Sequence, residues 1–307
     1  MIGYRQKRLR RNLIIRGQVI QIIRKFFIEH DYLEIETPVR IPAPAPEAHI
    51  DAVASGNWFL QTSPELCMKR LLAAGYPRIF QICKCFRQGE RGRFHLPEMT
   101  LLEWYRADSN YQDMMNECEA LIFSVAQKMG SKKDGIVYQG KEIRLIPPWS
   151  RISVKDAFDK FGSISLEGAL QRDQFDEIMV TEIEPGLGQS RPVFLYDYPA
   201  SRGALARLKP QDRRYAERFE LYIGGLEICN AFSELADSAE QRERFERDRD
   251  QLKKSGKPVY PMPEKFLATL GNMPAAAGNA LGVDRLVMLF SDSKQIDEVV
   301  AFTPEEL

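Results

Sequence analysis

Charged side chains crowd one short stretch of the chain, FRQGERGRFHLPEMTLLEWYR, at residues 86–106. Four arginines, three glutamates and a histidine stand there between two apolar runs. An arginine fork binds a phosphate or a carboxylate through two parallel hydrogen bonds, whereas acidic side chains hold ammonium groups or metal ions. The stretch therefore predicts a binding site for a ligand that carries both negative and positive charge.

Three residues of this stretch are the first candidates. Arg87 follows an apolar run that reads as a strand, so its guanidinium can meet a phosphate at the strand exit. Glu103 and Tyr105 stand two apart on the returning run, hence on one face of a strand, and could face an ammonium group together. The alternative for each charged residue alone is a solvated surface position.

A second group of candidates is the hairpin expected over residues 218–232, RFELYIGGLEICNAF, with its turn at Gly224-Gly225. This register puts Glu220 opposite Cys229 and places Glu220 and Glu227 diagonally on one face. Two such carboxylates repel unless a cation lies between them, and Mg²⁺ takes one or two carboxylates. The alternative is an exposed polar face.

Asn230 falls on the opposite face of this hairpin in the same register, so a role in the same site requires a β-bulge.

A third group of candidates lies in Gly278–Arg285, a glycine-rich turn expected to run into a helix that ends near residue 290. Glycine lets a ligand approach the backbone. Arg285 would lie in the first helical turn, which disfavours a cation and indicates an anionic or aromatic partner. A purely structural turn is the alternative.

Alternating and helical patterns predict the elements that must position these residues. Strands are expected at 33–38, 79–86, 99–105 and 192–201, with hairpins around 139–140 and 224–225. Helices are expected at 9–30, 62–75, 111–129, 238–254 and 283–290, and one begins near Ser153. Antiparallel strands interleaved with helices predict a single α+β domain around one large sheet, spanning residues 1–307.

Two helix starts carry specific capping predictions. For the helix at 62–75, Thr62 or Ser63 is the expected N-cap, with Pro64 in the first turn. For the helix at 238–254, Ser238 and Gln241 form a capping-box pattern.

Composition excludes several classes of protein. The 43 basic residues equal the 43 acidic ones, so no general nucleic-acid surface is indicated. Five scattered cysteines form no CxxC pair, and three histidines make a zinc site unexpected. Such thiols fit a reducing cytoplasm. The N-terminal apolar run is interrupted by Arg16 and Arg24, so neither a signal peptide nor a membrane span is expected.

The order of these features resembles the class II aminoacyl-tRNA synthetases. Residues 79–106 and 278–290 resemble motifs 2 and 3, and residues 9–38, ending at Pro38, resemble motif 1. The segments TSPELCMKRLLAAG, GLEICNAFSEL and ALGVDRLVML are similar to the lysyl branch, and most to its short ligases that modify translation elongation factor P. The resemblance extends from about residue 9 to about residue 303.

The resemblance implies a catalytic domain with an antiparallel sheet flanked by helices. Because motif 1 begins within the first ten residues, no anticodon-binding domain is expected and tRNA is not the expected substrate. The implied enzyme is a cytoplasmic homodimer that uses ATP and Mg²⁺, activates lysine or (R)-β-lysine as an adenylate, and transfers it to a lysine of elongation factor P. The alternatives are a free-standing synthetase that charges tRNA or makes a small amide, and a non-catalytic regulatory subunit.

The resemblance also implies roles for individual residues. Arg87 and Arg285 would be catalytic, with Arg87 on the α-phosphate and the substrate carboxylate. Glu220 and Glu227 would hold Mg²⁺. The amino acid would contact Ser63, Glu65, Glu103, Tyr105, Asn230, Glu234 and Ala280. The nucleotide would contact Arg87, Gly89, Glu90, His95, Met99, Glu227, Ile228, Gly282 and Arg285.

Three positions depart from the synthetase pattern. The usual Arg-x-Glu reads Arg87-Gln88-Gly89-Glu90, so either Gly89 or Glu90 would meet the adenine amine. Met99 stands where the family has a phenylalanine against adenine. Ala280 replaces a glycine of the lysyl branch, and its methyl group would favour β-lysine over α-lysine.

Overall fold

The computed structural model describes residues 3–130 and 135–307. The α-helices are α1 Gly3–Glu29, α2 Glu65–Ala73, α3 Tyr111–Lys128, α4 Val154–Phe161, α5 Leu166–Gln171, α6 Phe175–Ile178, α7 Ser238–Lys254, α8 Glu264–Leu270 and α9 Val283–Ser291. The strands are β1 Leu33–Glu34, β2 Arg40–Ile41, β3 Ala54–Ser55, β4 Trp58–Leu60, β5 Arg78–Phe86, β6 Glu98–Ala107, β7 Gly135–Tyr138, β8 Lys141–Arg144, β9 Ser150–Ser153, β10 Val193–Pro199, β11 Tyr215–Ile223, β12 Leu226–Ser233 and β13 Ala276–Gly282. Short π and 3₁₀ turns are η2 Met179–Ile183, η3 Glu184–Gly186, η4 Ala200–Arg202, η5 Ile296–Val299 and η6 Pro304–Glu306.

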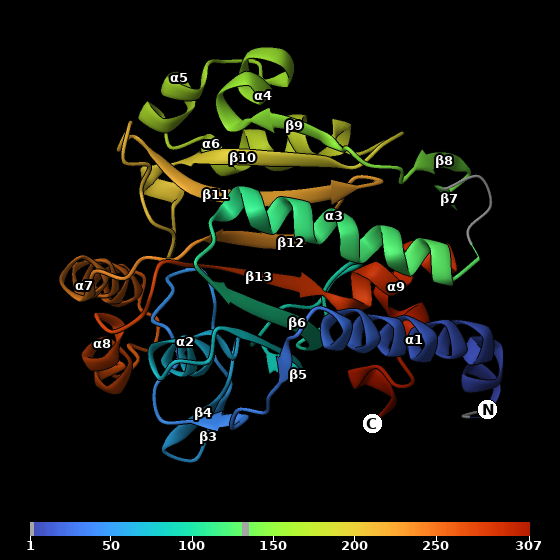
Figure 1. The fold of residues 1–307 in the computed structure, drawn as a ribbon, viewed down its shortest axis with the longest axis horizontal. Coiled ribbons are helices and arrows are strands. Elements are labelled where there is room, and N and C mark those ends of the chain that lie inside the picture. The colour runs from blue at the N-terminus through green and yellow to red at the C-terminus, as the bar shows by residue number, and fades with distance from the viewer. Residues whose placement is uncertain (1–2, 131–134) are drawn as a thin grey trace.

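One large sheet organises the fold (Figure 1). Its strand order is β1-β5-β6-β13-β12-β11-β10-β9. The strands from β5 to β10 pair antiparallel, and only the edge pairs β1–β5 and β9–β10 are parallel. The predicted α+β class with a large antiparallel sheet is therefore confirmed.

Helices α1, α3 and α9 cover one face of this sheet, and α3 crosses in front of it in Figure 1. Val19, Ile23 and Phe27 recur along α1 at helical spacing and are fully buried, which explains why this segment folds onto the sheet. Sheet residues such as Trp104 and Leu281 complete the same core. On this face the inward side chains of the central strands β6, β12 and β13 are buried in the core.

The opposite face is covered only toward its two edges. Helices α2 and α8 pack over β5 and β6, where Ile79 and Tyr105 join Met68 in an apolar cluster. Helices α4 to α6 pack over β10, where Leu195 joins a second cluster. The middle of this face, on β6, β13 and β12, stays open and carries the site.

The structure corrects three local predictions. Residues 278–282 belong to strand β13 rather than to a turn, because β6 and β12 pair with them on both sides. The N-cap of α7 is Asp237, whose carboxylate accepts from two backbone amides, and Ser238 is the first helical residue. Pro64 rather than Thr62 or Ser63 occupies the cap position of α2. Within the described residues, no helix has both the length and the apolarity to cross a bilayer.

Candidate active site

A row of side chains on neighbouring strands forms the floor of the site. Glu103 of β6 lies opposite Ala280 of β13, and Ala280 lies opposite Asn230 of β12. In the next row, Tyr105 lies opposite Gly278. Because directly opposed residues share a face of the sheet, these side chains point the same way. A cavity of about 270 Å³ lies above them.

A β-bulge in β12 brings Asn230 to this face. The sequence register placed Glu220 opposite Cys229, and that prediction was wrong, because Glu220 lies opposite Asn230. The strand carries one extra residue, Ile228, directly after Glu227, and such an insertion exchanges the faces of the residues beyond it. Cys229 consequently points into the core, while Asn230 lines the cavity.

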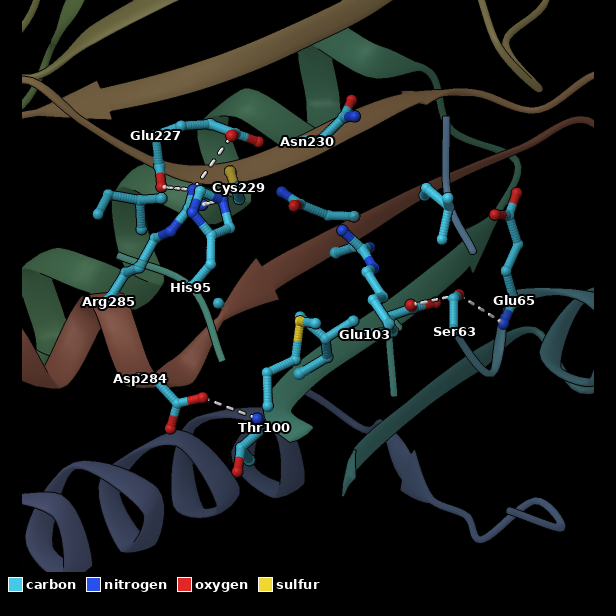
Figure 2. A pocket seen from close by; sticks show the side chains of 18 of the residues that line it. Ser63, Glu65, His95, Thr100, Glu103, Glu227, Cys229, Asn230, Asp284 and Arg285 are labelled. Atoms are coloured by element: carbon cyan, nitrogen blue, oxygen red, sulfur yellow. Dashed lines mark hydrogen bonds and ion pairs between the residues drawn. The ribbon is translucent and has the colours of Figure 1, made fainter. Parts of the chain in front are cut away.

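Two hydroxyl groups hold the buried carboxylate of Glu103 at one end of the cavity, and Figure 2 shows the contact with Ser63. Ser63 donates from Oγ to Oε1 of Glu103 over 2.6 Å, and the hydroxyl of Tyr105 donates to Oε2 over 2.9 Å. Ser63 Oγ also accepts from the backbone amide of Glu65 at the start of α2. Burial, together with the negative charge of Glu65, raises the pKa of Glu103 to about 7.

A buried lysine joins two further carboxylates behind this end. The side chain of Lys69 is only 1% exposed, and its ammonium lies 2.5 Å from Glu234 and in contact with Glu65. Burial would lower the pKa of Lys69, but the charges of Glu234 and Glu65 outweigh it and hold the pKa above its usual value. The three carboxylates Glu65, Glu103 and Glu234 thus face one cation, which leaves two negative charges when all are ionised.

The other end of the cavity carries Arg285 (Figure 2). Its guanidinium donates to the carbonyl of Glu227 over 2.8 Å and to the carboxylate of Glu227 over 3.1 Å. It also lies 2.6 Å from Nε2 of His95. Burial and the nearby cation lower the pKa of His95, so the neutral ring accepts from Arg285. Burial opposes ionisation of Glu227, yet Arg285 outweighs it and lowers the pKa of that carboxyl.

Arg87 lies in the cavity without a close partner. Its Nε is buried and has no acceptor among the described residues, and the nearest acidic oxygen, on Glu90, is 3.8 Å away. An unpaired buried donor costs about 1–3 kcal/mol. The side chain is therefore suited to an anion that enters the cavity.

Acidic side chains beside Glu227 fit a magnesium ion that arrives with phosphates. Glu220 accepts from Arg218 and from the hydroxyl of Tyr222, each over 2.6 Å. Burial and the charges of Glu220 and Glu227 raise the pKa of Glu184 to about 7. Among the described residues no three acidic, histidine or cysteine side chains converge as a complete metal site. Mg²⁺ needs only one or two carboxylates when phosphates and water complete its shell.

The two glycines of β13 differ in the space around them. A Cβ on Gly278 would lie 2.3 Å from Tyr105 and 2.5 Å from Glu234, so packing alone excludes any side chain. Gly282 has an ordinary φ of −72°, and a Cβ there would meet only Arg285, at 3.8 Å. Neither its conformation nor packing by the described residues requires this glycine, and the backbone beside it is open to the cavity.

The structure brings most of the predicted residues to one cavity. Those that line it are Ser63, Glu65, Arg87, Glu90, His95, Met99, Glu103, Tyr105, Glu227, Ile228, Asn230, Ala280, Gly282 and Arg285. Gly89, Glu220 and Glu234 do not line it. Glu234 lies behind the floor with Lys69, and Glu220 lies beside Arg218.

Several residues of the site were missed from the sequence. Lys69 stands four residues after Glu65 on α2, a spacing that signals an ion pair, although it does not reveal Glu234. Arg218 stands two residues before Glu220 on the same strand face, which was a readable signal. Asp284 binds Arg16 and the backbone amide of Thr100, and so ties α9 to α1 and β6. No local pattern indicates that contact.

An open antiparallel sheet face whose cavity holds two arginines and, at one end, a group of buried carboxylates suits a ligand that carries both negative and positive charge. The chain belongs to the class II aminoacyl-tRNA synthetase family, because the model for tRNA synthetases class II (D, K and N) matches residues 1–306.

The chain is similar to three bacterial proteins named elongation factor P–(R)-β-lysine ligase. It is 38% identical to the Erwinia tasmaniensis protein, 39% to that of Haemophilus influenzae strain PittGG and 38% to that of Proteus mirabilis. Each comparison covers 95% of this chain and 94% of the relative. The family expected from the motifs is therefore confirmed.

Proposed function

We propose that this protein is an ATP-dependent, AMP-forming ligase that activates (R)-β-lysine, or lysine, and transfers it to a lysine side chain of translation elongation factor P. The observation that carries the proposal is a cavity in which the buried Nε of Arg87 has no acceptor among the described residues and in which carboxylates outnumber cations at the acidic end. The relatives' names supply the amino acid and the acceptor. Residues 1–307 act as one catalytic unit, and the reaction belongs in the bacterial cytoplasm, where translation takes place.

In this proposal the chain activates the amino acid by positioning and electrostatics. The guanidinium of Arg87 donates hydrogen bonds to the α-phosphate and to the amino-acid carboxylate. It stabilises the charge that develops as the carboxylate oxygen attacks phosphorus. Arg285 holds the outer phosphates or the adenine, and Met99 and Gly282 leave room for the nucleotide. Mg²⁺, held by Glu227 and Glu220, would neutralise phosphate charge.

The acidic end selects a substrate with two amines. When all three are ionised, Glu65, Glu103 and Glu234 carry three negative charges against the single charge of Lys69, which leaves two. Lysine and β-lysine each bring two ammonium groups, so the buried charges balance only when such a diamine is bound. Tyr105 and Asn230 add polar contacts for the distal amine.

Two assays test the proposal. The protein should catalyse ATP–pyrophosphate exchange that depends on lysine or (R)-β-lysine. With radiolabelled amino acid, and with elongation factor P and total tRNA offered in parallel, label should appear on the protein and not on tRNA. Label on tRNA alone would support the synthetase alternative, and a protein that gives no exchange with any amino acid would contradict the proposal.

Binding of the amino acid should release protons near neutral pH. The pKa of Glu103 is raised to about 7, so part of the free protein carries a proton on this carboxyl at pH 7. A bound ammonium favours the ionised form, and affinity should therefore rise as pH increases through this value. Calorimetry with lysine in buffers of different ionisation enthalpy measures the release, which should be smaller in Glu103→Gln, where Glu234, whose pKa is also raised, can still lose a proton. Equal heats in all buffers would remove Glu103 from the ammonium site.

Ala280 should set the preference between the two isomers. Its methyl group lies between Glu103 and Asn230 on the floor of the cavity and would crowd the α-amine of lysine. A β-amine is displaced by one carbon and avoids this contact. One methyl group discriminates by about 1–3 kcal/mol, or about ten- to two-hundredfold. Ala280→Gly should therefore gain exchange activity with α-lysine by such a factor. No gain would contradict the steric explanation.

We also propose a homodimer formed through α1 and β1. Exposed apolar side chains on this surface support it, since Ile14, Ile28 and Leu33 are 52%, 61% and 50% exposed. Two chains of 35.3 kDa give 70.6 kDa (2 × 35.3). Light scattering at micromolar concentration should report this mass, and a stable particle of monomer mass would contradict the dimer.

A further inference from the structure

A second cavity adjoins the first at the reacting end of the amino acid. Its volume is about 260 Å³, and it lies between the segment 41–45, the start of α2 and the segment 261–266. Three residues, Glu47, Ser63 and Glu65, line both cavities. Glu47 lies close enough to Arg87 for that cation to act on its pKa, so the two spaces meet beside the arginine that would hold the amino-acid carboxylate.

The walls and the mouth of this second cavity differ in character. Ile41, Ala43, Leu66, Met262 and Phe266 make its walls mainly apolar. At its outer edge the exposed side chains Arg70, Glu264 and Lys265 meet solvent. An apolar cavity with charged residues at its mouth and carboxylates where it meets the first cavity matches a lysine side chain, whose methylenes are apolar and whose tip is cationic.

Glu47 occupies the junction and has no partner of its own. Among the described residues its carboxylate accepts no hydrogen bond. Burial and the charge of Glu65 raise its pKa to about 7. Arg87 and Arg218 act in the opposite direction, and Asp248 on α7 adds to the rise. Only the backbone of Glu47 makes described hydrogen bonds, to Ala45 and Ile50. The activation step proposed above does not use its carboxylate.

We propose that the acceptor lysine reaches the adenylate through this second cavity and that Glu47 accepts the proton from its ammonium group. The inference rests on the proposed function, because it assigns the route of that acceptor. The occupant is the lysine side chain of elongation factor P, and continuity with the activation cavity carries the argument.

The step balances without a further reactant. Glu47 takes one proton from the ammonium and leaves a neutral amine. The amine nitrogen attacks the carbonyl carbon of the aminoacyl-adenylate, a C–N bond forms, and the C–O bond to phosphate breaks with its electron pair on the oxygen of AMP. The remaining excess proton on nitrogen passes to that phosphate, and the proton on Glu47 returns to solvent.

Blocking the passage tests the route. Ala43→Trp fills the cavity from a partly exposed wall, and Ala301→Trp is the matched control at an exposed alanine that lines neither cavity. ATP–pyrophosphate exchange and trapping of the adenylate by hydroxylamine should be unchanged in both variants. Transfer to elongation factor P should fall by about 100-fold in Ala43→Trp alone, as expected when a reacting group is displaced.

The possible outcomes separate the two proposals. Transfer at the wild-type rate in Ala43→Trp would overturn the route while leaving the proposed function intact. A wild-type protein that gives no exchange would overturn the proposed function itself. If Ala43→Trp also loses exchange, Met262→Trp on the opposite wall replaces it, and normal transfer in that variant would equally overturn the route.

The pH profile tests Glu47. Transfer by the wild type should rise with pH and level off above about 7, where the carboxylate is the base. Glu47→Gln should transfer about 100-fold more slowly near neutral pH, the lower range for general-base catalysis. Its rate should keep rising toward the pKa of the free amine. An unchanged plateau in Glu47→Gln would overturn the role of this residue as proton acceptor.

Discussion

Arg87→Ala should lower the rate of adenylate formation by about two to three decades, because a fixed donor to developing oxyanion charge contributes ~3–4 kcal/mol. In the free protein this guanidinium has a buried Nε with no acceptor among the described residues. The side chain is therefore held ready for an anion and carries no contact that the fold needs. Its loss should remove transition-state stabilisation and leave the fold intact.

Arg91→Ala is the matched control for this prediction. Arg91 stands in the same loop, but it pairs with Asp297 and Glu305 outside the cavity. Exposed ion pairs contribute about 0–1 kcal/mol, so this variant should fold and catalyse almost normally. Pyrophosphate exchange with purified variants measures both. A drop of less than about fivefold in Arg87→Ala, far below the expected contribution, would show that the arginine does not touch the reacting phosphate.

Local patterns were sufficient to predict β5, β6 and the hairpin of β11 and β12. Alternation over 79–86 and 99–105 predicted β5 and β6, and the two-residue spacing placed Glu103 and Tyr105 on one face, as observed. The predicted diagonal placement of Glu220 and Glu227 also holds on the shared face. These features depend only on the period of a strand and on a two-residue turn, which a sequence displays directly.

Contacts between distant segments could not be predicted in the same way. The bulge at Ile228 changes no residue type, so an unbroken ladder put Asn230 on the wrong face. The stretch 278–282 was read as a turn because small residues dominate it, whereas its neighbours in the sheet make it a strand. Lys69 and Glu234 meet only after α2 has packed on the sheet, and no local spacing signals that ion pair.

Lys69→Met should lower the free energy of unfolding of the ligand-free protein by about 3–5 kcal/mol at pH 8, the cost of removing one partner from a buried ion pair. The variant keeps Glu65, Glu103 and Glu234 together without their cation. Between pH 5.5 and 8 the raised pKa of Lys69 keeps it charged in the wild type, so its own titration does not enter this window.

The loss should shrink as pH falls. Burial raises the pKa of Glu103 and Glu234, so in this window the folded state binds protons that the unfolded state has released. Stability then decreases as pH rises toward the raised pKa. Removing Lys69 raises these carboxyl pKa values further, which makes the decrease steeper in the variant than in the wild type. Urea unfolding of both proteins at pH 5.5 and pH 8 measures the difference.

Two further variants decide what the loss means. Lys25→Met removes an exposed lysine 3.7 Å from Glu29 on α1 and should cost only about 0.3–0.5 kcal/mol. The double variant Lys69→Met/Glu234→Gln also removes one of the buried carboxylate charges left without a cation, and should recover part of the stability. The effects of substituting two residues in contact on the free energy of unfolding are not additive. If the Lys69→Met loss is equal at both pH values and Glu234→Gln restores nothing, the lysine acts through packing alone. The charge balance that we use to explain selection of a diamine would then be wrong.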